Sequence, residues 1–350
     1  MIYLGLMSGT SLDGLDAVFC TFHPQGTGYG YEILFGTTVE YDDEIREMLQ
    51  NAPFVSGEQL IFYDRKYGHH LGKKVNELIA LSGITPDIIA SHGHTVFHAP
   101  DRKFTFQMGH GAAIAAECNL PVMNDFRSLD VALGGHGAPL VPIGDKLLFP
   151  QFDACLNLGG FANVSLERDG KRIAWDISPV NFIANHLASL KGKAYDHDGL
   201  TGAAGAVQKS LLDKLESLDY YRKKYPKSLG REWVESNMDF LLSGGDGYSI
   251  EDTLRTFYEH VALRITNDIN LKSGKVLCTG GGAKNRFLMQ CIQEKAQWEV
   301  VIPEDELIDF KEALIFAFLC FLKQTGKPNC LASVTGASRD SLSGSVLFVS

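Results

Sequence analysis

The sequence has few cysteines, no long apolar run and no cluster of basic residues. Its seven cysteines include no Cys-x-x-Cys pair, a pattern that predicts reduced thiols. The longest apolar run, residues 313–322, is too short to span a membrane. The N-terminus has no basic region followed by an apolar stretch, which argues against a signal peptide. We therefore expect a cytoplasmic protein without a membrane span.

The charge of the chain also limits its partners. The formal net charge is −10 and no block of basic residues occurs, which argues against nucleic acid as the main partner. An acidic protein can still bind a nucleotide, because loop amides and a metal ion act locally on the phosphates.

Glycine, by contrast, is abundant. The 350 residues include 36 glycines, which cluster in turns, and 45% of the chain is hydrophobic. This composition is sufficient for two domains with sizeable cores. An apolar strand, a glycine-rich turn and a second strand occur at the start and recur after about 150 residues. The repeat predicts an α/β protein of two similar lobes, residues 1–148 and 149–350.

The first of these turns is a candidate phosphate site. Apolar residues 2–7 and 15–22 predict the two strands of a β-hairpin. The turn between them contains Ser8, Gly9, Thr10, Ser11 and Gly14. Its N–H groups and hydroxyls suit phosphate oxygens, Gly9 and Gly14 can adopt positive φ, and Asp13 could hold a metal ion. The alternative is an ordinary hairpin turn, since no Gly-Lys-Ser/Thr of a Walker motif follows.

Three histidines follow the strand expected at residues 87–91. His92, His94 and His98 could be metal ligands, but their spacing fits no standard zinc pattern and neutral polar contacts are the commoner role. Ligand contact by His94 and Thr95 is the favoured interpretation, because α/β sheets bind ligands at the carboxyl ends of their strands.

Charged residues follow two later strands. Arg127 suits a carboxylate or a phosphate and Asp130 suits hydroxyl groups, although an Arg–Asp pair that fixes a loop fits the spacing equally well. Asp176 ends an expected strand just before a helix, so it is a candidate general base. The alternative for Asp176 is an interaction with the dipole of that helix.

A second glycine-rich loop lies far along the chain. Residues 275–278 predict a strand, and three glycines separate it from a helix expected at residues 286–294. Such glycines allow a flat ring or a phosphate to lie against the backbone, so we interpret the loop as a nucleotide site.

Two further stretches leave alternatives open. The polar turn at residues 193–199 could order a loop at a cleft or be a solvated turn. Glu312, near the start of a helix expected at residues 311–323, is either a ligand or a first-turn charge.

Six motifs occur in order along nearly the whole chain. They are MSGTSLDG at residues 7–14, SHGHT at 91–95, DFRSLDVALGGHGAPLVP at 125–142, LNLGGFANV at 156–164, YDHDG at 195–199 and TGGGAKN at 279–285. The first motif and the GGHGAPLVP segment are specific, and the ordered set resembles the anhydro-N-acetylmuramic acid kinase family.

The resemblance implies an actin/hexokinase-like (ribonuclease H-like) fold of two lobes, with ATP in a central cleft between them. It also implies a bacterial cytoplasmic enzyme of peptidoglycan recycling, and it leans toward a homodimer. The reaction would open the 1,6-anhydro ring of an amino sugar, anhydro-N-acetylmuramic acid, with water and would phosphorylate the released 6-hydroxyl. ATP with Mg²⁺ would be the donor and N-acetylmuramic acid 6-phosphate the product.

The resemblance further implies roles for particular residues. Asp176 would be the general base that deprotonates the attacking water, and Asp13 would be the metal ligand. The residues implied for nucleotide binding are Gly9, Thr10, Ser11, Leu12, Asp13, Gly14, Leu15, Asp16, Gly159, Gly160, Gly280, Gly281, Gly282 and Asn285. Those implied for sugar contact are Thr95, Arg127, Asp130 and Glu312, with Arg127 as the partner of the lactyl carboxylate.

Departures from the family pattern keep other functions open. The family usually has DTGPGN where this chain has DISPVN at residues 176–181. Ile177 and Val180 would add bulk to a loop near the phosphates and tolerate positive φ poorly. His94 and His136 stand where the family usually has glutamine. The alternatives are therefore an actin-like kinase for another sugar or a degenerate nucleotide-binding scaffold.

Overall fold

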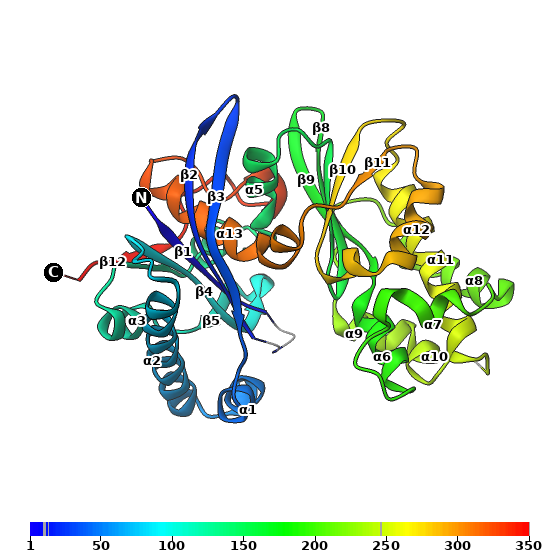
Figure 1. Cartoon of the computed structure of the whole chain (residues 1–350), viewed down its shortest axis with the longest axis horizontal. Helices are drawn as coiled ribbons and strands as arrows, with labels where there is room; N and C mark the ends of the chain where they lie inside the picture. The colour runs from blue at the N-terminus through cyan, green and yellow to red at the C-terminus, as the bar shows by residue number, and fades with distance from the viewer. Residues whose placement is uncertain (10–11, 13, 246, 350) are drawn as a thin grey trace. The chain divides into compact units, whose positions relative to one another are not determined.

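The computed structural model describes residues 1–9, 12, 14–245 and 247–349 of the chain. The chain forms two compact units, Met1–Pro150 with Phe310–Ser350, and Gln151–Asp309 (Figure 1). The first boundary lies close to the expected end of the first lobe at residue 148. The second differs from expectation, because residues 310–350 return to the first unit.

A mixed sheet forms the centre of the first unit. Its strands are β1 (Tyr3–Ser8), β2 (Leu15–Gln25), β3 (Gly28–Val39), β4 (Ile88–Ala99), β5 (Phe104–Met108), β6 (Val122–Asn124) and β12 (Ser345–Leu347). They lie in the order β12-β6-β4-β1-β2-β3, with β5 paired to β4. β1, β2 and β3 are antiparallel neighbours, whereas β4 is parallel to β1 and β6 is parallel to β4.

The second unit has a sheet of the same plan. Its strands are β7 (Ala154–Leu158), β8 (Phe161–Arg168), β9 (Lys171–Pro179), β10 (Lys275–Thr279) and β11 (Glu299–Val301). They lie in the order β11-β10-β7-β8-β9. β7, β8 and β9 are antiparallel neighbours, and β10 is parallel to both β7 and β11.

Each sheet thus repeats one strand order. The first strand is central, the next two lie antiparallel on one side of it, and two parallel strands lie on the other side. This is the ribonuclease H-like order, and its occurrence in both units is the hallmark of the actin/hexokinase-like fold. The predicted fold class is therefore confirmed.

The helices of the first unit pack on its sheet. They are α1 (Asp43–Asn51), α2 (Gly57–Ser82), α3 (Gly111–Cys118), α4 (Ser128–Ala132), α5 (Val141–Leu148), α13 (Asp305–Gln324) and α14 (Ala332–Thr335). Ser56 Oγ caps α2 by accepting from Gln59 N at 3.2 Å. Gly83, at φ +70°, ends α2 by donating its N–H to Ile79 O at 2.9 Å.

The two faces of β1 contact different helices. Leu4 and Leu6 share one core with buried residues of α2. On the other face, an added Cβ on Gly5 would lie 2.0 Å from Ala313 O of α13, so the helix backbone approaches the strand closely. Because successive side chains of a strand alternate between faces, β1 is covered on both sides. The close packing at Gly5 explains why α13 from Phe310 onward belongs to the first unit.

The second unit contains most of the shorter helices. They are α6 (Asn181–Ser189), α7 (Leu200–Ala203), α8 (Lys209–Glu216), α9 (Arg231–Asn237), α10 (Asp239–Leu242), α11 (Ile250–Ile269) and α12 (Arg286–Lys295). Leu254, Phe257, Val261 and Ile265 of α11 are fully buried in one core with the strands β7–β9. Across the described ranges of the chain, each helix is too short or too polar to cross a membrane.

Replacing Gly5 by alanine is expected to destabilise the protein by about 1–3 kcal/mol or more, because β1 and α13 must separate to admit the methyl group. The matched control is Gly57→Ala, since a Cβ on Gly57 would meet nothing within 4 Å. The control should leave the free energy of unfolding unchanged or raise it by up to about 1 kcal/mol. Urea unfolding of both variants measures the difference, and equal stabilities would contradict the packing of α13 on β1.

Candidate functional site

The turn between β7 and β8 is fixed against the start of α6. Val180 N donates to Gly160 O at 2.8 Å, and Asn181 N donates to Gly159 O at 3.2 Å. A Cβ on Gly160 would meet nothing within 4 Å, and one on Gly159 would meet nothing closer than 3.5 Å. The turn therefore offers an open backbone surface that a ligand can approach.

The glycine loop after β10 lies against the end of β7. Gly280 has φ +81°, and a Cβ there would lie 2.9 Å from Leu158 O, so glycine is required. A Cβ on Gly282 would lie 2.8 Å from Leu158 Cβ. Gly281 is exposed, and a Cβ on it would meet only Asn181 Nδ2 at 3.6 Å. The loop thus combines two glycines held by packing with one that faces open space.

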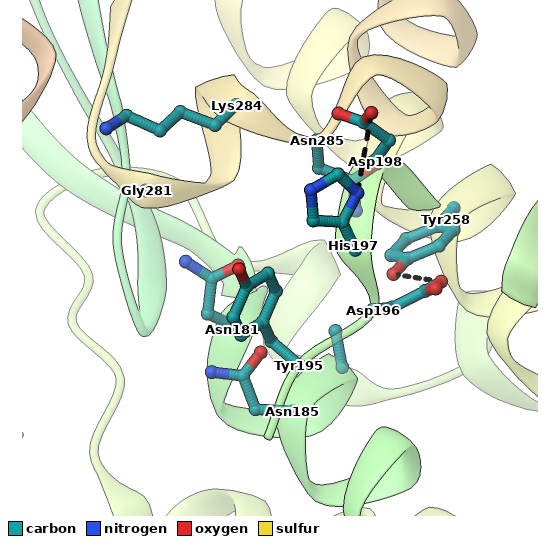
Figure 2. Close-up of a pocket in the computed structure, with 11 residues that line it drawn as sticks. Asn181, Asn185, Tyr195, Asp196, His197, Asp198, Tyr258, Gly281, Lys284 and Asn285 are labelled. Atoms are coloured by element: carbon teal, nitrogen blue, oxygen red, sulfur yellow. Dashed lines mark hydrogen bonds and ion pairs between the residues drawn. The ribbon is translucent and has the colours of Figure 1, made fainter. Parts of the chain in front are cut away.

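A pocket of about 350 Å³ is formed by α6, the turn at residues 195–198 and the loop before α12 (Figure 2). Its lining residues are Asn181, Ala184, Asn185, Tyr195, Asp196, His197, Asp198, Tyr258, Gly281, Lys284 and Asn285. Its volume is in the range of small-molecule sites.

Only part of this lining was expected from the sequence. Gly281 and Asn285 were predicted to bind the nucleotide, whereas Asn185, Tyr195 and Lys284 were missed. Asn181 and Asn185 are one helical turn apart on α6, and this spacing of two amides was the signal that could have identified them.

The polar turn at residues 193–199 is ordered by Asp196, which is 5% exposed. The Asp196 carboxylate accepts from Thr201 N at 2.8 Å and from Gly202 N at 3.1 Å. It also accepts from Tyr258 Oη at 3.0 Å (Figure 2). These bonds fix the turn, so that Tyr195 and the next three residues line the pocket. The turn is therefore ordered through Asp196, while Lys193, Tyr195 and His197 are exposed to solvent, so each of the two alternatives for this turn describes part of it.

Asp176 lies in β9, directly before a β-bulge at Ile177. Its carboxylate accepts from Leu229 N at 2.8 Å. Burial raises the pKa of Asp176 above its ordinary value, although the Leu229 hydrogen bond and the charge of Lys227 act in the opposite direction. Because α6 begins at Asn181, Asp176 is not a residue of the first turn of that helix. A carboxylate of raised pKa is suited to accept a proton.

The altered loop at residues 176–181 places its larger side chains in the core. Ile177, Ser178 and Val180 are fully buried, and Ile177 and Val180 pack with Ile183. Val180 has φ −132°, so the backbone makes no demand for a positive φ. We expected Ile177 and Val180 to add bulk to a loop near the phosphates. This expectation is wrong, because both side chains pack in the core of the second unit.

In the first unit, Arg127 is held by strand β4 and by the loop that contains Gly137. Its Nε and Nη2 donate to His92 Nε2 at 3.2 and 2.9 Å, and its Nη1 donates to Gly137 O at 2.6 Å. Burial lowers the pKa of Arg127 to about 10, and the charge of Glu312 acts in the opposite direction. Arg127 is therefore a cation at neutral pH.

Asp130 is fully buried and holds the loop that contains Gly137. Its carboxylate accepts from Gly137 N at 2.7 Å, from Thr335 Oγ1 at 2.8 Å and from Cys330 Sγ at 3.0 Å. We expected Asp130 to contact the sugar, but its oxygens are engaged inside the protein. The alternative interpretation was that Arg127 and Asp130 fix a loop. The structure agrees with it, because Gly137 donates to Asp130 and accepts from Arg127.

Glu312 lies within α13, beyond its first turn, so the alternative of a first-turn charge is wrong. Burial raises the pKa of Glu312, whereas the charges of Lys311 and Arg127 act in the opposite direction. Lys311 Nζ also forms a buried ion pair with Asp145 Oδ1 at 2.8 Å. Glu312 and Arg127 thus interact electrostatically within the first unit.

His94 belongs to a buried chain of hydrogen bonds below the opening turn. His94 Nδ1 lies 3.1 Å from Ser8 Oγ, which accepts from Tyr41 Oη at 2.8 Å. Tyr41 Oη is in turn hydrogen-bonded to Tyr67 Oη at 2.7 Å. Burial lowers the pKa of His94 to about 4, so the ring is neutral at physiological pH. These hydrogen bonds anchor Ser8, the last residue of β1, where the opening turn begins.

Thr95 follows His94 on β4 and is partly buried. Thr95 Oγ1 accepts from Gln107 Nε2 at 3.4 Å. His98, further along β4, is exposed and hydrogen-bonded to Thr105 Oγ1 at 3.2 Å. The three histidines of the expected cluster therefore have separate polar partners.

The opening turn is described in part, since Thr10, Ser11 and Asp13 lie outside the described residues. Leu12 N lies 3.5 Å from Gly9 O, and Leu12 has φ +59°. Gly14 serves close approach rather than a positive φ, because a Cβ there would lie 2.7 Å from Thr38 Cγ2. Leu15 is buried in the core, and Asp16 Oδ1 accepts from Thr38 Oγ1 at 2.6 Å. The predicted hairpin is confirmed, and Leu12 is left-handed among the described residues of its turn.

Comparison with protein families gives a match over almost the entire chain. The family model described as anhydro-N-acetylmuramic acid kinase matches residues 1–349. The anhydro-N-acetylmuramic acid kinase of Aliivibrio fischeri is 36% identical over 367 residues, covering 96% of each chain. The one of Shewanella amazonensis is 35% identical, covering 98% of this chain and 97% of its own.

Solved structures of distant sequence also match. Component A of the (R)-2-hydroxyglutaryl-CoA dehydratase from Acidaminococcus fermentans is 14% identical, with a TM-score of 0.49, and covers 93% of this chain and 100% of its own. A ROK family glucokinase from Streptomyces griseus is 12% identical, with a TM-score of 0.40, over 91% of this chain and 98% of its own. The fold assignment rests on the sheet topology described above.

The buried state of His94 predicts a pH-dependent stability. Between pH 6.5, the ordinary pKa of histidine, and about 4, only the unfolded chain binds a proton at His94. The free energy of unfolding should therefore fall as the pH falls through this window, by up to about 1.4 kcal/mol per pH unit from this group. Urea titrations at several pH values should show a smaller slope for His94→Gln than for the wild type.

The control for this prediction is His23→Gln, since His23 is exposed on β2. This variant should keep the slope of the wild type. An unchanged slope in His94→Gln would show that His94 is protonated in the folded protein.

Proposed function

Because the chain belongs to the anhydro-N-acetylmuramic acid kinase family, we propose that it is an ATP-dependent kinase of peptidoglycan recycling. It opens 1,6-anhydro-N-acetylmuramic acid with water and phosphorylates the 6-hydroxyl, giving N-acetylmuramic acid 6-phosphate. The single observation that carries the mechanism is Asp176, a partly buried carboxylate of raised pKa at a bulge of β9. Such a group is the base that attack by water requires.

Asp176 takes up the proton of the attacking water. The water oxygen bonds to the anomeric carbon, and the bond from that carbon to O6 breaks with its electron pair going to O6. Bound ATP supplies the phosphoryl group that O6 then carries. The Leu229 N–H, which donates to the Asp176 carboxylate at 2.8 Å, leaves the other acceptor positions of the carboxylate for water.

The nucleotide is held by the second unit. The pocket of Figure 2 takes the nucleoside, with the exposed ring of Tyr195 as an aromatic surface and the amides of Asn181 and Asn185 as polar partners. The phosphates lie toward the backbones of Gly160 and Gly281, where a Cβ would meet open space or only one amide nitrogen. These observations fit a nucleotide, because its phosphates need close approach to N–H groups.

The sugar is held by the first unit. Arg127 binds the lactyl carboxylate, because its guanidinium stays charged and offers N–H groups in a fork. Glu312 accepts from hydroxyl or amide groups of the sugar, and Thr95 adds a hydroxyl. Asp130 acts by holding Gly137, whose carbonyl orients Arg127.

Other elements of the family resemblance stay predictions. Mg²⁺ would neutralise charge on the transferred phosphoryl group, with Asp13, outside the described residues, as its predicted ligand. The nucleotide roles of Thr10 and Ser11, the homodimer and the cytoplasmic location are predictions of the same kind.

Sugar-dependent ADP release tests the proposed function. Purified protein with ATP, Mg²⁺ and 1,6-anhydro-N-acetylmuramic acid should release ADP, and a sample without the sugar should not. Asp176→Asn should lower kcat by about 10²- to 10⁴-fold, the usual contribution of a general base, while nucleotide affinity measured by calorimetry stays unchanged.

Asp169→Asn is the matched control, since Asp169 lies in the exposed turn before β9 and should leave turnover unchanged. Turnover by Asp176→Asn near the wild-type rate would remove Asp176 as the base. Nucleotide binding without turnover in the wild type would favour the scaffold or another sugar.

The raised pKa of Asp176 also predicts the acid limb of the pH–rate profile. The carboxylate must be ionised to accept a proton, so kcat/KM should fall toward acid pH as Asp176 becomes protonated. The midpoint should lie above the ordinary aspartate value of about 3.9, because burial raises the pKa. Initial rates measured after brief exposure to each pH give this profile, and recovery of activity at neutral pH is the control for unfolding. A value of kcat/KM that stays constant down to pH 4 would contradict the prediction.

A further inference from the structure

We propose that His92 is a positioning residue that orients Arg127 toward the carboxylate of the sugar. The inference rests on the proposed function, because it concerns how the first unit recognises an acidic sugar. It assigns a role to a histidine that the sequence alone left between a metal ligand and an ordinary polar contact.

The tautomer of His92 is set by its surroundings. His92 Nδ1 lies 2.8 Å from the carbonyl oxygen of Gly93, so Nδ1 carries the hydrogen and donates it. Nε2 is then an acceptor, and it receives N–H groups from both Nε and Nη2 of Arg127 at 3.2 and 2.9 Å. The ring is 4% exposed, and burial together with the charge of Arg127 keeps its pKa well below the ordinary value. His92 therefore stays a neutral acceptor at physiological pH.

The backbone around His92 directs it to Arg127 and not to the opening turn. Gly93 has φ +73°, and the pairing of β4 with β1 shifts register between Ser91 and His94. This bulge lies between two histidines that have different partners, since His94 contacts Ser8 while His92 contacts Arg127. A bulge of this kind re-aims a side chain that a regular strand would place elsewhere.

Both hydrogen-bond acceptors of Arg127 are uncharged. One is His92 Nε2 and the other is Gly137 O, at 2.6 Å from Nη1. Together they use three of the five N–H groups of the guanidinium, so within the described part of the chain one N–H group on each of Nη1 and Nη2 has no hydrogen-bond partner. Two terminal N–H groups on a cation whose hydrogen-bond partners carry no negative charge suit a bidentate carboxylate ligand.

An aromatic ring completes the support. Phe316 of α13 lies against the His92 ring, with centroids 4.5 Å apart, and Arg127 Cζ is 6.0 Å from the Phe316 centroid. The guanidinium is thus held at its edge by His92 and lies over the ring of Phe316. An arginine fixed in this way loses less conformational freedom when it binds a carboxylate, which favours the acidic sugar over a neutral one.

Calorimetric binding of the sugar to the wild type and three variants tests this role without requiring turnover. His92→Phe removes the acceptor and should weaken binding of 1,6-anhydro-N-acetylmuramic acid by about 10- to 100-fold, the range for a hydrogen bond to a charged group. His92→Gln supplies an amide oxygen as acceptor and should recover most of the affinity. His23→Phe, at an exposed position of β2, is the matched control and should bind as the wild type does.

A double-mutant cycle separates positioning from a merely structural role. In an Arg127→Ala background, His92→Phe should change sugar affinity by less than about twofold, because the residue it orients is absent. Binding of 1,6-anhydro-N-acetylglucosamine, which lacks the lactyl carboxylate, should be insensitive to His92→Phe. Additive effects in the cycle, or equal losses for both sugars, would overturn the proposal.

The same experiments distinguish failure of this inference from failure of the proposed function. A wild-type protein that binds the acidic sugar but releases no ADP would contradict the proposed function. The double-mutant cycle of binding would then still decide the role of His92. A wild type that binds neither sugar would overturn both.

Discussion

The first unit depends on the close contact between Gly5 of β1 and the backbone of α13. A side chain at position 5 would lie 2.0 Å from Ala313 O, so the helix can reach the central strand only because that strand carries a glycine. The contact brings Glu312 and Phe316 to the part of the unit that holds Arg127 and His92. Residues from three distant stretches of the chain are thereby joined in one candidate site.

Neutral and charged groups have distinct tasks in this site. His92 and His94 are buried and uncharged, and they orient Arg127 and Ser8. Asp130 is enclosed by donors and fixes Gly137. The charge available to a ligand is then concentrated on Arg127 and Glu312. In the second unit, burial likewise raises the pKa of Asp176 and makes it a better proton acceptor.

Local patterns were sufficient to predict much of this structure. The opening hairpin and the strand–glycine–helix unit around Gly280 follow from short-range rules of strands and turns. The repeat of strand–turn–strand also indicated that two units share one topology. These features depend on residues that are close in the sequence, so one amino-acid sequence is sufficient to predict them.

Features set by distant neighbours could not be predicted in this way. The apolar pattern of α13 predicts a helix but does not show which sheet it packs on. Residues 310–350 were therefore expected in the second unit, whereas they belong to the first. Asp130 looked like a ligand because its donors, Thr335 and Cys330, come from far along the chain. The pocket residue Tyr195 was missed because its place depends on the bonds of Asp196 to Thr201 and Tyr258.

The most direct test of the account is the mass of the product formed from 1,6-anhydro-N-acetylmuramic acid, ATP and Mg²⁺. The account predicts one product that has gained both the elements of water and a phosphoryl group, because ring opening and phosphorylation occur in one turnover. A product that has gained a phosphoryl group alone, or ADP released with the sugar unchanged, would contradict the account.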